Sequence, residues 1–275
     1  MEVERLVELM GDLPTMPVVA IKILKLASSE DANVSDVTQL IASDQGLASK
    51  ILSTCNSAYY GLPQRVKTLS RAVSLLGFKS VRNLVLVHSL PWKRSTTPSF
   101  ADQAIFAHAG ATAMAARVIA SLTGRVDPEE ALLGGLLHDT GRLALNLAAH
   151  EEYEPVMHAI YNLEGESIEL ERRALGLDHT QAGDQILRKW TFPEDLVRVA
   201  RTHHDPPAGL GPNVLVVRAA DELSRITGQG VRALSEPATA VPPALALLGF
   251  KQGDLESLEQ RVAQAIEQGK DIFAV

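Results

Sequence analysis

Residues 131–139 read Ala-Leu-Leu-Gly-Gly-Leu-Leu-His-Asp, an apolar stretch that ends in a histidine–aspartate pair. The stretch predicts a buried helix over residues 128–139. A polar pair attached to a buried helix is costly unless its polar atoms are satisfied. A metal ion would satisfy both side chains at once, because imidazole and carboxylate are ordinary ligands of iron, manganese, zinc and cobalt. We therefore expect helical structure here and a candidate metal site at His138 and Asp139.

Helical periodicity extends from this stretch over most of the chain. Apolar residues recur at helical spacing between residues 18 and 26, 34 and 41, 47 and 52, and 81 and 88. Ser35 and Asp44 are expected to cap two of these helices. Strict alternation of apolar and polar residues, which is typical of strands, is absent over any useful length. The sequence predicts an all-α fold.

A cluster of helix-breaking residues divides the chain. Residues 91–98 read Pro-Trp-Lys-Arg-Ser-Thr-Thr-Pro, which predicts a boundary. We expect an N-terminal helical module over residues 1–92 and a helical domain over residues 98–275. The 275 residues are enough for a sizeable core, so no disulfide or metal is needed for stability on grounds of size alone.

Composition and charge exclude several classes of protein. The chain holds 26 Lys and Arg against 33 Asp and Glu, a net charge of −7, which argues against direct nucleic-acid binding. Its single cysteine, Cys55, cannot form an internal disulfide and favours the cytoplasm. The N-terminus lacks the features of a signal peptide, and no apolar run approaches about 20 residues, the length of a membrane span. We expect a cytoplasmic protein without membrane contact.

Further candidate ligands lie on separate helical segments. His203 and His204 end one predicted helix, and His179 lies at an expected helix start. Asp221 falls on an otherwise apolar helix, and His108 on an Ala-rich helix where close packing leaves little access to water. A carboxylate on such a helix either faces water or meets a positive partner.

Each candidate also has an ordinary structural explanation. The His138–Asp139 pair could orient a turn, and His203 and His204 could be surface residues near a helix C-terminus, where histidine interacts well with the helix dipole. His179 could simply be a first-turn residue of a helix, His108 a core side chain with its hydrogen bonds satisfied, and Asp221 a solvated carboxylate. The combination favours a metal site, because five separate segments each supply a ligand.

The chain resembles a known family in two respects. The order His108, His138-Asp139, Asp221 is similar to the metal-binding signature of the HD superfamily of metal-dependent phosphohydrolases, and His179 with His203-His204 resembles the extended ligand set of its HD-GYP branch of cyclic-di-GMP phosphodiesterases. The N-terminal part resembles the HDOD domain, the HD-related output domain of bacterial signalling proteins. That resemblance covers roughly residues 5–226 and rests on Leu-Pro-Thr-Met-Pro (13–17), Asp-Gln-Gly-Leu (44–47), Asn-Ser-Ala-Tyr-Tyr-Gly (56–61) and Ala-Val-Ser-Leu-Leu-Gly (72–77).

The resemblance implies an HD-like multi-helix bundle preceded by a helical HDOD module. It implies one or two divalent ions, iron or manganese with zinc as a further option. The implied ligands are His108, His138, Asp139, His179, His203, His204 and Asp221. Two divalent ions would exceed the charge of the two carboxylates by two, which would attract phosphate, and Arg142 is expected to hold that phosphate. In this reading Asp139 bridges the ions and orients an attacking water.

Two positions depart from the HD-GYP pattern. Arg142 stands where those enzymes usually carry lysine, and no Gly-Tyr-Pro element follows His204. The missing element counts against cyclic-di-GMP as a substrate.

Three functional hypotheses follow. The first is a regulatory output module that acts through signalling protein partners or a nucleotide ligand. A homodimer is one form in which such a module would act. The second is a metal-dependent phosphohydrolase or phosphodiesterase acting on a nucleotide, with Asp139 and Arg142 in its chemistry. The third is a metal or oxygen sensor that uses the same ligands.

Overall fold

The computed structural model describes residues 8, 13, 16–27, 33–57, 59–90, 98–226, 228, 240–270 and 272–273. Two compact units divide the chain. The C-terminal unit comprises Met1–Pro14 and Pro91–Ala265, and the N-terminal unit comprises Thr15–Leu90 and Ile266–Val275. The expected domains, residues 1–92 and 98–275, are each continuous in sequence, whereas each unit combines two segments.

All regular structure in the described residues is helical, and no strand occurs among them. The predicted all-α fold class is therefore confirmed. The cause is visible in the sequence, where apolar residues follow the helical period and prolines and capping residues stand at helix ends.

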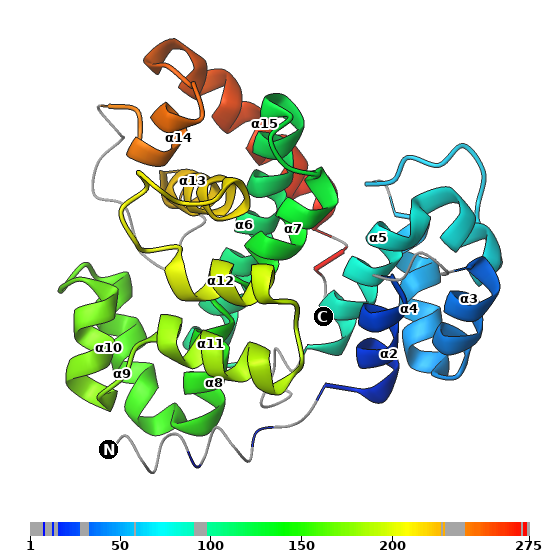
Figure 1. The fold of residues 1–275 in the computed structure, drawn as a ribbon, viewed down its shortest axis with the longest axis horizontal. Coiled ribbons are helices and arrows are strands. Elements are labelled where there is room, and N and C mark those ends of the chain that lie inside the picture. Colours follow the sequence, from blue (N-terminus) through cyan, green and yellow to red (C-terminus); the bar gives the residue numbers. More distant parts are fainter. Residues whose placement is uncertain are drawn as a thin grey trace. The chain divides into compact units, whose positions relative to one another are not determined.

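The N-terminal unit contains α2 (Val18–Ala27), α3 (Val34–Ala42), α4 (Gln45–Cys55) and α5 (Leu69–Ser89) in its described part (Figure 1). Helix α5 packs against the other three. Asp44 caps α4 as predicted, accepting a hydrogen bond from the backbone N–H of Leu47. The predicted cap Ser35 lies instead in the first turn of α3. Asn33 caps that helix, because its extended backbone lets its side chain accept from the N–H of Asp36.

The C-terminal unit holds the remaining described helices (Figure 1). They are α6 (Phe100–Thr123), α7 (Pro128–Leu137), α8 (Thr140–Ala148), α9 (His150–Tyr161), α10 (Ser167–Leu175), α11 (His179–Lys189), α12 (Glu194–Thr202), α13 (Pro212–Ile226), α14 (Pro243–Leu247), the 3₁₀ turn η1 (Gln252–Asp254) and α15 (Leu255–Gly269), whose last residues fall in the other unit. The helix predicted to run to residue 139 ends at Leu137, so His138 and Asp139 form the turn between α7 and α8.

Helix α6 is the core helix of the C-terminal unit and packs mainly on α7 and α13. Small residues make close approach possible. A Cβ added at Gly135 of α7 would lie 2.7 Å from the Cα of Ala113 in α6. Among the described helices α6 alone has the length and hydropathy of a membrane span, and 67% of its most apolar window is buried inside the protein. Its burial is what a core helix requires.

Helices α8 and α11 approach each other even more closely. A Cβ added at Gly141 of α8 would lie 1.8 Å from the backbone oxygen of His179 and 2.6 Å from the backbone nitrogen of Gly183. Only glycine fits at this position. The contact brings the start of α11 next to the turn that carries Asp139.

Candidate metal centre

The C-terminal unit brings all seven predicted ligands together. His108 comes from α6, Asp221 from α13, and His179 is the first residue of α11. The other four come from the turn after α7 and the segment after α12. The ligand atoms form two clusters, each with its atoms within 4.8 Å of one another: Asp139, His179, His203 and His204 in one, and His108, His138 and Asp221 in the other.

Asp139 lies between the two clusters. Its Oδ2 is 3.6 Å from the Nε2 atoms of both His108 and His138. Its Oδ1 is 3.3 Å from Nε2 of His179 and 3.4 Å from Nε2 of His203. One carboxylate thus presents one oxygen to each group of imidazoles, which is the arrangement of a bridging ligand.

In the cluster around His108, the ligands contact one another, and a backbone hydrogen bond orients His138. Nε2 of His108 is 3.2 Å from Oδ1 of Asp221 and 3.3 Å from Nε2 of His138. Nδ1 of His138 donates to the backbone oxygen of Gly135 at 2.7 Å. Because a carbonyl oxygen only accepts, this bond assigns the proton to Nδ1 and leaves a lone pair on Nε2, facing the cluster.

The second cluster shows the same arrangement. Nδ1 of His179 is 2.6 Å from Oε2 of Glu171, and Nδ1 of His203 is 2.9 Å from the backbone oxygen of Ala200. Each of these rings thus has an acceptor behind its Nδ1, and its Nε2 faces Asp139. His204 is half-buried, and its Nδ1 lies 3.2 Å from Nη1 of Arg218.

Three buried atoms of this cluster have no hydrogen-bond partner: Oδ1 of Asp139, Nε2 of His179 and Nε2 of His203. An unsatisfied buried polar atom costs about 1–3 kcal/mol, and three converging on one point would be unusual without a ligand. Imidazole nitrogen and carboxylate oxygen are ordinary metal ligands, so one cation coordinated by all three atoms would satisfy them together. The residues present therefore fit a divalent metal.

Burial and neighbouring charges set the protonation states that metal ligands need. Burial lowers the pKa of His138 to about 3, although Asp139 opposes the shift. Burial would raise the pKa of Asp139, but Arg142, His138 and His179 outweigh it and hold that pKa well below the usual range. For Asp221, Arg225 and His108 outweigh burial in the same direction. Near neutral pH the site thus offers a neutral His138 and two carboxylates.

Arg142 is placed differently from its predicted role as a phosphate ligand. It is 2% exposed, and its Nε donates to Oδ2 of Asp139 at 2.8 Å. Its Nη1 donates to Oε1 of Glu171 at 2.6 Å. Both bonds point to carboxylates of the protein, so this side chain is placed to orient Asp139.

Sequence reasoning missed Glu171, the residue behind His179 and Arg142. Its carboxylate also accepts from the hydroxyl of Tyr153 at 2.9 Å. A signal was present, because Ser167, Glu171 and Leu175 recur every four residues and form the buried face of α10. A carboxylate in the middle of such a face indicates a buried polar network. Arg225, which pairs with Asp221 four residues earlier on α13, was missed as well.

Comparison of the sequence with known proteins identifies a family and two relatives. The family model of the HDOD domain matches residues 13–206. An uncharacterised protein of Treponema pallidum is 26% identical over 203 residues, which is 71% of this chain and 38% of that protein. The Bacillus subtilis protein YuxH, also uncharacterised, is 31% identical over 68 residues, 25% of this chain and 17% of its own length. The chain thus spans less than half of the length of either relative.

Solved structures share the fold. An HDOD domain protein of unknown function from Geobacter sulfurreducens superposes with a TM-score of 0.82 at 21% identity, over 99% of this chain and 98% of that one. A candidate signal transduction protein from Marinobacter aquaeolei gives 0.75 at 24% identity, over 98% of this chain and 64% of that one. A candidate phosphohydrolase from Shewanella amazonensis gives 0.72 at 22% identity, over 98% of both chains.

At these identities the structures show a common fold and nothing about a common activity. Family membership rests on the sequence, because the HDOD family model matches more than half of the chain. Its match ends at residue 206, so it covers six of the seven predicted ligands and leaves out Asp221. The chain belongs to the HDOD family.

Proposed function

We propose that the chain is a signalling output module whose C-terminal unit binds two divalent metal ions, iron or manganese with zinc as a further option. The observation that carries this proposal is the position of Asp139, whose two oxygens face two separate groups of imidazoles. His-rich sites with carboxylates suit these metals. In this function the metal centre stabilises a form of the protein that acts through cytoplasmic signalling partners.

Each metal position would draw on one cluster. His108, His138 and Asp221 would hold one ion, and His179, His203 and His204 the other, with Asp139 shared. Bound ions would supply Lewis acidity and a more acidic bound water. The chain itself keeps Asp139 ionised through Arg142 and fixes the His179 ring through Glu171.

A second candidate function is a phosphohydrolase or phosphodiesterase acting on a nucleotide. Two observations favour it. Two divalent ions would leave a positive surplus over Asp139 and Asp221, which favours an anionic substrate. Two arginines that contact site residues are partly exposed, Arg218 at 19% and Arg225 at 23% of the side chain. Each of the two also pairs with a carboxylate, Arg218 with Glu222 and Arg225 with Asp221, but both are more exposed than Arg142 and therefore better placed to meet a phosphate.

Metal content tests the shared part of both functions. The chain, purified without added metal and without a metal-binding tag, should contain about two equivalents of metal by elemental analysis. Asp139→Asn should lose both, because the amide that replaces the carboxylate cannot bridge two cations. A matched control is Asp102→Asn, which alters another buried carboxylate of the same unit outside both clusters and should keep its metal. A folded, helical wild-type chain without stoichiometric metal would contradict the proposal.

Hydrolysis of bis(p-nitrophenyl) phosphate by the metal-loaded chain separates the two functions. Turnover that disappears in Asp139→Asn and persists in Asp102→Asn would establish the hydrolase. A metal-loaded chain without turnover on this ester, or on a panel of cyclic nucleotides, favours the regulatory module.

A further inference from the structure

The N-terminal unit carries a concentration of positive charge in an acidic chain. Residues 45–90 hold six Lys and Arg and no Asp or Glu, although the whole chain has a net charge of −7. The six cations are Lys50, Arg65, Lys67, Arg71, Lys79 and Arg82. Such local asymmetry indicates a surface for an anionic partner when the cations meet at a cavity.

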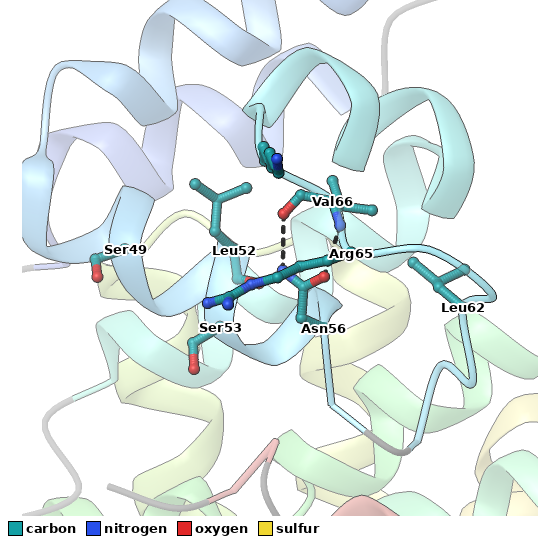
Figure 2. A pocket seen from close by; sticks show the side chains of 8 residues that line it. Ser49, Leu52, Ser53, Asn56, Leu62, Arg65 and Val66 are labelled. Carbon is teal, nitrogen blue, oxygen red and sulfur yellow. Dashed lines mark hydrogen bonds between the residues drawn. The ribbon is translucent and has the colours of Figure 1, made fainter.

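Several of these cations do meet at a cavity. A groove of about 1030 Å³ runs between one face of α4 and the extended segment 62–67 (Figure 2). Ser49, Ser53 and Asn56 lie along that face of α4, and Arg65 and Lys67 lie on the opposite wall. A second groove, of about 510 Å³, follows the same segment and is lined in addition by Arg71. Among the residues that the structure describes, no carboxylate lines either groove.

Asn56 fixes the shape of the groove. Its side-chain amide donates to the backbone oxygens of Leu52 and Val66, at 2.7 and 2.8 Å, and its oxygen accepts from the N–H of Val66 at 2.7 Å. These bonds tie the extended segment to the end of α4. The groove is thus formed before any ligand arrives, which reduces the entropic cost of binding.

Its cations are available for a ligand. Arg65 and Lys67 are exposed, and Val66 between them is buried. Figure 2 shows Arg65 extended across the groove, with its guanidinium on the side where Leu52 and Ser53 lie. Within the part of the chain that the structure describes, neither cation has an ion-pair or hydrogen-bond partner.

We propose that this groove binds the phosphoryl group of a nucleotide-sized ligand. The guanidinium of Arg65 and the ammonium of Lys67 only donate hydrogen bonds, and the hydroxyls of Ser49 and Ser53 can rotate to donate. Because these donors lie on two walls of the groove, they can reach different oxygens of one tetrahedral phosphate. Leu52, Leu62 and Val66 supply an apolar wall for the rest of the ligand. The volume suits a small molecule, since such ligands occupy sites of about 300–1,000 Å³. This site is separate from the metal centre and does not depend on the proposed function.

Titration of the full chain with ADP, and with inorganic pyrophosphate for the phosphoryl part alone, tests the proposal. The titrations are done in EDTA, so that anions bound through a metal do not contribute. Both probes should bind and shift the backbone amide resonances of Ser49, Ser53 and Lys67. Lys67→Gln should weaken binding tenfold or more, since it removes a charge-assisted hydrogen bond to the phosphate. Arg65→Lys should also weaken it, because the forked geometry is lost while the charge remains.

The matched control is Lys22→Gln, which removes the same charge from an exposed position of the same unit outside the groove lining. It should bind both probes like the wild type. Absence of binding at millimolar probe, or equal weakening by Lys22→Gln and Lys67→Gln, would overturn the proposal. Tighter binding of a polyglutamate peptide than of either probe, sensitive to Lys67→Gln, would also overturn it and assign the groove to an acidic protein.

Discussion

Asp139 occupies the N-cap position of α8 but makes no cap hydrogen bond. An aspartate at this position normally accepts from a backbone N–H of the first turn, which contributes about 1 kcal/mol. Asp178, at the start of α11, does so and accepts from the N–H groups of Thr180 and Gln181. Asp139 turns to Arg142 and the imidazoles instead. The local stability that this residue gives up is consistent with a role as a ligand.

Glu171 provides the sharpest test at the scale of a residue. Its buried carboxylate accepts from Nδ1 and the backbone N–H of His179, from Arg142 and from Tyr153. Glu171→Gln removes the charge and places an NH₂ group among these donors. We expect a loss of about 3–5 kcal/mol in the free energy of unfolding, because the guanidinium of Arg142 loses one of its two carboxylates. Metal affinity at the His179 position should fall about 10–100-fold.

The measurement is metal content at limiting metal, with stability from urea unfolding. Glu171→Gln should lose the ion of the His179 cluster and retain the ion of the His108 cluster, so the stoichiometry falls from two toward one. The control Glu194→Gln breaks an exposed ion pair with Arg188 and should change neither quantity appreciably. A folded Glu171→Gln variant with both ions bound at wild-type affinity would contradict the role given to Glu171.

The identities of candidate ligands could be predicted from the sequence, whereas the roles of their supporting residues could not. The order of histidines and aspartates along the chain is a local property that a family resemblance preserves. The partner of Arg142 depends on how α8, α10 and α11 pack, and Glu171 follows it by 29 residues. No pattern near Arg142 distinguishes a phosphate from a distant carboxylate as its partner.

At the scale of helices, the approach of α8 to α11 controls the site. Gly141→Ala would place a Cβ against the backbone of His179 and Gly183, and backbone cannot move aside as a flexible side chain can. The two helices must separate, which moves His179 away from Asp139. Overpacking typically costs about 1–3 kcal/mol and occasionally more. We expect a lower midpoint of thermal unfolding and a loss of the ion held by His179.

Gly211→Ala is the control, since its added Cβ would meet no atom within 4 Å. It should leave metal content unchanged. If Gly141→Ala does not fold, Gly183→Ala offers a milder change at the same contact, because its Cβ would lie 3.2 Å from the Cβ of Ala200. Elemental analysis and circular dichroism on the three variants check the prediction. Full metal content in a folded Gly141→Ala chain would show that the close approach is dispensable.

Helix existence could be predicted well from periodicity, and helix ends less well. The apolar run before residue 138 gives no sign that the helix stops at Leu137, because His138 retains helical dihedral angles and only Asp139 departs from them. Asn33 and Ser35 are both good capping residues, and the choice between them depends on where the chain leaves its extended conformation. Such ends follow from tertiary packing, which lies outside any local window.

At the scale of the whole molecule, each unit carries its own reporter of unfolding. Trp190 is 2% exposed in the C-terminal unit, and the only cysteine, Cys55, is fully buried in the N-terminal unit. The chain has two tryptophans, so in a Trp92→Phe variant all tryptophan fluorescence comes from Trp190. Labelling of Cys55 by a thiol reagent reports exposure of the other core. The stability of each unit can thus be followed in one full-length chain.

Removal of metal should destabilise one unit and not the other. An ion that binds only the folded state stabilises it by about 2.7 kcal/mol when free metal is a hundredfold above Kd. All candidate ligands lie in the C-terminal unit, so EDTA should shift the urea midpoint of Trp190 fluorescence downward and leave the midpoint of Cys55 labelling unchanged. In Asp139→Asn the chelator should move neither midpoint, because that variant has no bound metal to lose. An equal shift of both midpoints in the wild type would mean that the units unfold as one, and metal binding would then stabilise the groove between α4 and residues 62–67 as well as its own unit.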